Sequence, residues 1–155
     1  MSGVRVLVDA DACPVKEEVY RVALRHQASV VIVANAYLRI PEHRLISRQV
    51  VTDGFDAADD WIAEAAGPDA LVITADILLA QRALEKGARV LAPTGKPFTD
   101  ASIGNAVAVR AIHADLRAGL GENAPRGAAP FSKQDRSRFL NAMEVEMVAL
   151  KKVAR

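Results

Sequence analysis

The chain contains a single cysteine, Cys13, so it cannot form an internal disulfide bond. It also lacks a secretory leader pattern and any apolar run long enough to cross a membrane. These absences argue against a secreted or membrane protein, since disulfides are typical of oxidising compartments. The sequence therefore predicts a cytoplasmic protein with no membrane association.

Several motifs that would identify a function are also missing. There is no P-loop, no GxGxxG turn and no CxxC pair. The three histidines are scattered, and with one cysteine they give no zinc-ligand spacing. Aromatic residues make up only 5% of the chain, so its core must be built from aliphatic side chains. The 155 residues fit one domain.

Short apolar runs alternate with helical patterns along the chain. The predicted strands are residues 4–8, 29–34, 49–52, 70–74 and 89–91, and the predicted helices are residues 14–26, 56–66, 76–86, 102–117 and 132–153. This alternation predicts an α/β fold with a mostly parallel central sheet and helices on both faces. The most apolar strands, 4–8, 29–34 and 70–74, should be central, and several topologies make the first and the 70–74 strand neighbours.

The domain organisation follows from composition. We expect an α/β domain over residues 1–118, a Gly/Pro-rich loop over 119–131, and a C-terminal amphipathic helix over 132–155. Ser132, followed by Asp135, resembles a capping box for this helix. The helix would pack on the same domain, although a contact in a homo-oligomer is an open alternative.

Carboxylates follow the buried strands where those strands end. Asp9 ends the first strand and Asp11 follows it, while Thr74 and Asp76 end the 70–74 strand. Ligands of open α/β sheets bind outside the carboxyl ends of the strands. Converging carboxylates favour a hard divalent cation such as Mg²⁺ or Mn²⁺. The alternative is that each aspartate only forms a turn or caps a helix.

A strongly acidic segment supplies further candidates. Residues 49–76 hold seven acids and neither lysine nor arginine. Asp56, Asp59 and Asp60 begin a predicted helix in this segment, and the sequence does not choose among them. An acidic site with basic surroundings suits a metal site that receives a polyanion, whereas uneven surface charge is the simpler interpretation.

Other chemistry-bearing residues leave alternatives open. Cys13 would stand at a helix N-cap, where a lowered thiol pKa invites a nucleophile, but no partner motif accompanies it and a packed or capping cysteine is the preferred interpretation. Asp9-Ala-Asp11 also fits the D-x-D pattern of aspartyl-phosphate phosphatases, which needs a downstream lysine. The candidate substrate or phosphate contacts are Lys16, Asn35, Thr74, Arg82 and Lys96.

The motifs together resemble those of the YaiI/YqxD family of uncharacterised bacterial proteins. They are Asp9-Ala-Asp-Ala-Cys-Pro14, Val33-Ala-Asn35, Gly54-Phe-Asp-Ala-Ala-Asp59, Val72-Ile-Thr-Ala-Asp-Ile77, Lys86-Gly87 and Gln134-Asp-Arg136. The resemblance covers nearly the whole chain. It implies a PIN-like three-layer sandwich and a metal-dependent nuclease.

The resemblance also implies roles for individual residues. Asp9, Asp59 and Asp76 would bind the metal, Asp11 would act with them, and Asn35 would lie beside the site. The chain departs from the family where it has Pro93-Thr94-Gly95, because an arginine usual there is missing. If that arginine binds phosphate in the family, this chain would bind it differently, with Arg82 or Lys96 as candidate substitutes.

The sequence is compatible with three functions. The first is a Mg²⁺- or Mn²⁺-dependent nuclease or phosphodiesterase acting on RNA or single-stranded nucleic acid. The second is a non-catalytic module that binds nucleic acid or another partner. The third is the D-x-D phosphatase.

Overall fold

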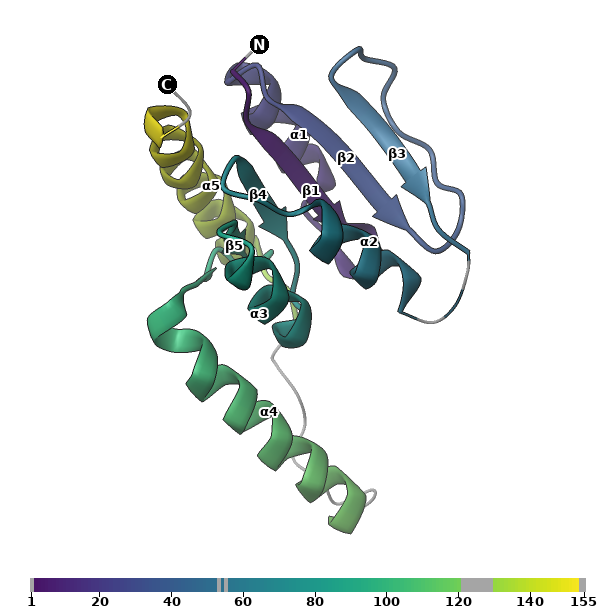
Figure 1. Cartoon of the computed structure of the whole chain (residues 1–155), viewed down its shortest axis with the longest axis vertical. Helices are drawn as coiled ribbons and strands as arrows, with labels where there is room; N and C mark the ends of the chain where they lie inside the picture. The colour runs from purple at the N-terminus through teal and green to yellow at the C-terminus, as the bar shows by residue number, and fades with distance from the viewer. Residues whose placement is uncertain (1, 53, 55, 121–129, 154–155) are drawn as a thin grey trace.

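The computed structural model describes residues 2–52, 54, 56–120 and 130–153, and a six-stranded sheet runs through it (Figure 1). The strands are β1 (Arg5–Asp9), β2 (Ser29–Ala34), β3 (Ile46–Val50), β4 (Ala70–Ile73), β5 (Arg89–Leu91) and β6 (Pro97–Phe98). The α-helices are α1 (Lys16–Arg25), α2 (Ala57–Ala65), α3 (Ile77–Glu85), α4 (Asp100–Leu120) and α5 (Lys133–Val153). No helix within these ranges is long and apolar enough to cross a membrane.

The strand order is β3-β2-β1-β4-β5-β6, which places β1 between β2 and β4. β1 pairs in parallel with both neighbours, and Val8 lies level with Ile32 and Ile73. All pairs are parallel except the one between β5 and β6. The chain winds outward from β1 in both directions, so a switch point lies between β1 and β4. The predicted adjacency of these two strands is confirmed.

Helices cover both faces of the sheet because the strand side chains alternate between two apolar clusters. Val6 and Val8 pack in one cluster with α1 and α5. Leu7 packs in the other with α2 and α3. The predicted fold, a mostly parallel α/β sheet between two helical layers, is confirmed. The helix α4 leads away from the sheet, and residues 108–119 are exposed along it (Figure 1).

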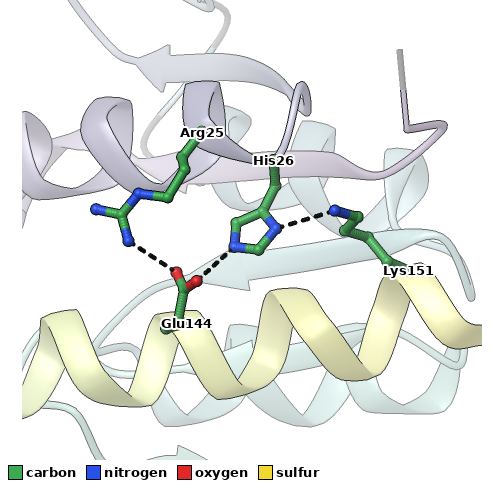
Figure 2. A network of polar contacts seen from close by, with 4 residues as sticks. All are labelled: Arg25, His26, Glu144 and Lys151. Carbon is green, nitrogen blue, oxygen red and sulfur yellow. Dashed lines mark hydrogen bonds and ion pairs between the residues drawn. The ribbon is translucent and has the colours of Figure 1, made fainter.

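Polar contacts attach α5 to α1. The buried ring of His26, at the end of α1, lies between Glu144 and Lys151 of α5, with Nε2 2.9 Å from Glu144 Oε1 and Nδ1 3.2 Å from Lys151 Nζ (Figure 2). The Arg25 guanidinium reaches the same carboxylate, and Arg136 pairs with the buried Glu18. The Lys151 ammonium can only donate a hydrogen bond, so Nδ1 of His26 is its acceptor. Nε2 of the neutral imidazole is then the donor to Glu144.

The start of α5 has the predicted capping box. The Ser132 backbone N–H donates to Asp135 Oδ2 over 2.9 Å, and the Asp135 N–H donates to the Ser132 hydroxyl over 3.1 Å. Two otherwise unpaired donors of the first helical turn are thereby satisfied.

Several predicted boundaries were wrong. Residues 10–12 form a short 3-10 helix, η1 (Ala10–Ala12), and α1 begins at Lys16 rather than at Pro14. β3 covers residues 46–50 where a loop was expected up to residue 48, because its exposed polar residues hide the strand pattern. The segment 97–98 pairs with β5 instead of remaining in a loop. The helix α4 includes residues 119 and 120, and residues 121–129 of the predicted loop lie outside the described ranges.

Candidate functional site

Carboxylates line a cavity of about 560 Å³ at the carboxyl ends of β1 and β4. Its walls are formed by Asp9, Asp11, Asn35, Asp56, Ala58, Asp59, Asp60, Asp76, Leu78, Leu79, Arg82 and Arg110. The acids come from β1, η1, the start of α2 and the start of α3, which are far apart in sequence. Parallel pairing brings them together, since the carboxyl ends of parallel strands lie at one edge of the sheet.

Asp9, the last residue of β1, is held by the strand beside it. The Thr74 hydroxyl donates a hydrogen bond to Asp9 Oδ2 over 2.9 Å, and the Thr74 side chain is buried. Burial raises the pKa of Asp9, the nearby charges of Asp11 and Asp76 raise it further, and the hydrogen bond from Thr74 opposes them. Its carboxylate is therefore oriented but destabilised as an anion.

Asp11 lines the cavity from the short 3-10 helix that follows β1. The chain leaves the strand at Ala10 and turns through η1, so Asp9 and Asp11 do not share a strand face. The exposed Asp11 carboxylate instead accepts a hydrogen bond from Asn35 Nδ2 over 2.8 Å. Asn35 follows β2, so this contact joins the ends of two neighbouring strands.

Asp76 both caps a helix and lines the cavity. Its Oδ1 accepts hydrogen bonds from the backbone N–H groups of Leu78 at 2.9 Å and Leu79 at 3.1 Å. Its own N–H donates to the Thr74 hydroxyl oxygen over 3.0 Å. The capping alternative is thus correct for Asp76, and the same geometry fixes its carboxylate at the cavity wall.

The three acids at the start of α2 have different surroundings. Asp60 pairs with Arg82 at 2.8 Å, and Asp56 is exposed. For Asp59, desolvation and the negative charges of Asp76, Asp9 and Asp56 raise the pKa to about 6. Asp59 is therefore the helix acid most strongly coupled to the strand-end carboxylates.

The acidic segment does not act as one unit. Asp69 forms a salt bridge of 2.7 Å with Arg5 at the opposite end of β1, and this hydrogen-bonded pair lowers the pKa of the Asp69 carboxyl. Asp53, another acid of the segment, lies outside the described residues. The charge run in the sequence therefore overstates how many acids reach the cavity.

Two arginines line the cavity, and one of them had no sequence signal. Arg82 projects from α3, as expected for a residue near Asp76, and Arg110 comes from the exposed middle of α4. The position of Arg110 depends on the direction in which α4 leaves the sheet, which no local pattern encodes. Lys16 donates to the Cys13 carbonyl over 2.9 Å, and Lys96 lines a separate hollow beside Phe98.

Cys13 is not at a helix N-cap. It follows η1, and Val15 occupies the N-cap position of α1. The side chain is buried, and desolvation raises the pKa of the thiol. The idea of a dipole-activated nucleophile at this residue was wrong, and a packed cysteine remains.

The carboxylates form a donor set that suits a hard cation, but they do not form a closed cage. Among the described residues, no three acidic, histidine or cysteine side chains stand close enough to enclose a metal ion. Mg²⁺ usually keeps several waters and takes only one or two carboxylates together with substrate phosphates. The residues present therefore fit an open, partly hydrated site.

Comparisons with known proteins agree on one family. Residues 7–149 match the model of a family described as uncharacterised, YaiI/YqxD. A protein of Sphingopyxis alaskensis named UPF0178 protein is 65% identical over 152 residues, covering 98% of each chain. One from Nitrobacter winogradskyi with the same name is 55% identical, covering 93% of this chain and 90% of its own. No solved structure matches the chain significantly.

Proposed function

The chain belongs to the uncharacterised YaiI/YqxD family, and from its carboxylate cavity we propose that it is a Mg²⁺- or Mn²⁺-dependent phosphodiesterase acting on RNA or single-stranded nucleic acid. Asp9 and at least one of Asp59 and Asp76 would contact the metal, with Asp11 beside them.

The observation that carries this proposal is the mutual coupling of acids from separate elements. Asp9, Asp59 and Asp76 come from β1, α2 and the start of α3, yet the charges of Asp9 and Asp76 raise the pKa of Asp59. Such an arrangement costs stability unless a cation neutralises it. Strongly shifted acids in a concave site are typical of functional sites.

The chain's own residues would prepare this site for a phosphodiester. When bound, a divalent cation polarises a phosphoryl oxygen and lowers the pKa of a coordinated water. Thr74 orients Asp9, and Asn35 orients Asp11. Arg82 and Arg110 on the cavity wall would attract the phosphate group that approaches the acids.

The D-x-D phosphatase is less well supported by this cavity. That reaction needs a lysine near the nucleophilic aspartate, whereas the cations lining the described part of the cavity are Arg82 and Arg110. A non-catalytic binding module would bind without metal and cleave nothing, and both differences from the proposed enzyme can be measured.

Thermal melting and cleavage with Mn²⁺ test the proposal. We expect Mn²⁺ to raise the melting temperature and to support cleavage of single-stranded oligonucleotides, because a ligand that binds only the folded state stabilises it. Asp9→Asn should abolish both effects. Asp115→Asn, an exposed acid on α4, is the matched control and should retain both.

Two outcomes would contradict the proposal. A melting temperature that Mn²⁺ leaves unchanged, together with no cleavage, would contradict the metal-dependent enzyme. Metal-independent oligonucleotide binding that survives Asp9→Asn, without cleavage, would favour the binding module, and trapping of an aspartyl-phosphate would favour the phosphatase.

A further inference from the structure

A second and larger hollow, of about 950 Å³, lies along the outer edge of the sheet. It is lined by Tyr37, Arg39, Ile40, Pro41, Glu42, His43, Ile46 and Arg48, and we call it the β3 groove. Most of these residues belong to the segment that joins β2 to β3. The two strands are parallel, and this segment crosses between them without an α-helix and lies beside the edge strand β3 (Figure 1).

The groove contains an exposed aromatic ring stacked on an arginine. The Arg48 guanidinium lies 4.3 Å from the centroid of the Tyr37 ring, and Tyr37 is 70% exposed. Arg48 projects from a strand, so its backbone is fixed by pairing with β2. A planar cation over one ring face holds the ring in place, and exposed aromatic rings of this kind are stacking platforms for unpaired bases.

Positive charge surrounds this platform. Arg39 and Arg48 line the groove, and Arg44 is exposed in the same segment. Glu42 brings one opposing charge to the lining. The Leu45 backbone N–H donates to His43 Nδ1 over 3.0 Å, which leaves Nε2 as the donor of a neutral ring. The groove therefore combines two permanent cations in its lining, and a third in the same segment, with donors and a flat aromatic surface.

The groove lies close to the carboxylate cavity. Asp9 is level with Val33, and Val33 is level with Gln49, the residue after Arg48. Two strand spacings separate the backbones of Asp9 and Gln49, or about 10 Å. Asn35 donates a hydrogen bond to Asp11 and precedes Tyr37 by two residues. The Cα atoms of Asn35 and Tyr37 therefore lie within about 8 Å of each other. Arg48 is level with Ile32, which packs on the α1 face of the sheet, whereas Asp9 follows Val8 and so points to the α2 face. A chain seated on the groove would therefore pass around the carboxyl end of the sheet to reach the acids.

We propose that the β3 groove binds single-stranded nucleic acid, with an unpaired base stacked on Tyr37 and phosphates on Arg39 and Arg48. The inference rests on the proposed function, because this groove would deliver the substrate to the carboxylate cavity. The charge complements a phosphate backbone. The exposed ring selects single strands over duplexes, because duplex bases are already stacked on one another.

Fluorescence anisotropy with a labelled oligouridine in EDTA tests the groove without any cleavage. Tyr37→Leu removes the ring but retains bulk, and it should weaken binding about tenfold, whereas Tyr37→Phe should bind like the unaltered chain. Each arginine–phosphate contact contributes about 0.7 to the slope of log K against log salt. Arg48→Gln should reduce that slope by this amount, and Arg117→Gln on exposed α4 should leave it unchanged.

The outcomes separate this inference from the proposed enzyme. Binding in EDTA that is weakened about tenfold in Tyr37→Leu and retained in Asp9→Asn supports the groove even if no metal ever binds. Oligouridine binding that is undetectable, or that Tyr37→Leu leaves unchanged, overturns the groove even if Mn²⁺ still binds the acids. Equal affinity for duplex RNA or for polyglutamate would also overturn it, because neither ligand offers an unpaired base.

Discussion

The hydroxyl of Thr74 donates a hydrogen bond to Oδ2 of Asp9 over 2.9 Å, across the pair of strands at the centre of the sheet. The same hydroxyl oxygen accepts the N–H of Asp76. One buried side chain thus connects the acid that ends β1 to the acid that begins α3. The Thr74 hydroxyl therefore helps to fix the positions of the two carboxylates.

Thr74→Val tests this dependence with a side chain of the same shape. It should cost about 1–3 kcal/mol of unfolding free energy, because it removes both hydrogen bonds of this hydroxyl and leaves the Asp76 N–H without its acceptor. Groups that orient metal-binding carboxylates typically change metal affinity at least tenfold, so the dissociation constant for Mn²⁺ should rise by about that factor. Calorimetric titration measures it. Thr52→Val, at an exposed threonine, is the control, and equal affinities in the two variants would contradict the assigned role.

Asp59→Asn should stabilise the metal-free protein at neutral pH. The folded-state pKa of Asp59, about 6, lies above the ordinary value of 3.8, so the folded protein binds this proton more tightly than the unfolded chain does. Wild-type stability should therefore fall as the pH rises from 4 to 6 and then level off. Asparagine stays neutral at every pH, so the variant does not lose this stability as the pH rises.

Melting curves of both proteins in EDTA across that range measure the effect. The variant should melt higher than wild type above pH 6 and equally near pH 4. A variant that melts lower at neutral pH would show that the Asp59 carboxylate is stabilised, and not strained, by its neighbours.

Gly95→Ala should destabilise the fold strongly. Gly95 has a φ of +90°, and a Cβ there would lie 2.7 Å from the Arg138 carbonyl carbon and 2.8 Å from the Phe139 nitrogen of α5. Backbone atoms cannot move aside as a flexible side chain can, so we expect a loss of more than about 2 kcal/mol. Urea unfolding measures it.

Gly104→Ala is the matched control for this substitution. A Cβ at Gly104 meets no atom within 4 Å, and the residue lies inside α4. Alanine should stabilise the helix by about 0.5–1 kcal/mol. If both alanine variants behaved alike, the close approach of Gly95 to α5 would be refuted.

The network in Figure 2 predicts that Glu144 contributes more to the free energy of unfolding than its surface position suggests. Its partner His26 is buried, so Glu144→Ala leaves a ring nitrogen without its bond and should cost about 1–3 kcal/mol. Arg25→Gln removes an exposed pair at 3.5 Å and should change stability by less than about 0.5 kcal/mol. Chemical unfolding of the two variants tests the difference, and equal losses would contradict it.

The centre of the fold was predictable because burial on both faces gives β1, β2 and β4 continuous apolar runs. The bounds of β3 and the existence of β6 were not. In β3, Ser47, Arg48 and Gln49 are exposed, and β6 has only two residues, one of them Pro97. Apolar periodicity carries no signal for such edge strands.

The candidate site divides in the same way. Asp9 and Asp76 were predictable as acids that follow buried strands, and Thr74 came with them. The turn through η1 depends on how residues 10–15 pack, so the local pattern could not foresee it. Arg110 and the stacking of Arg48 on Tyr37 arise from tertiary placement, and their sequence neighbours give no indication of either.

The central claim is that the carboxylates at the switch point between β1 and β4 hold a divalent cation. Crystals soaked in MnCl₂ and measured for anomalous scattering test it most directly. We expect a manganese peak within the cavity, contacting Asp9 and at least one of Asp59 and Asp76, and no peak there in Asp9→Asn crystals. A cavity without anomalous density under conditions that saturate exposed carboxylates elsewhere on the surface would contradict the claim.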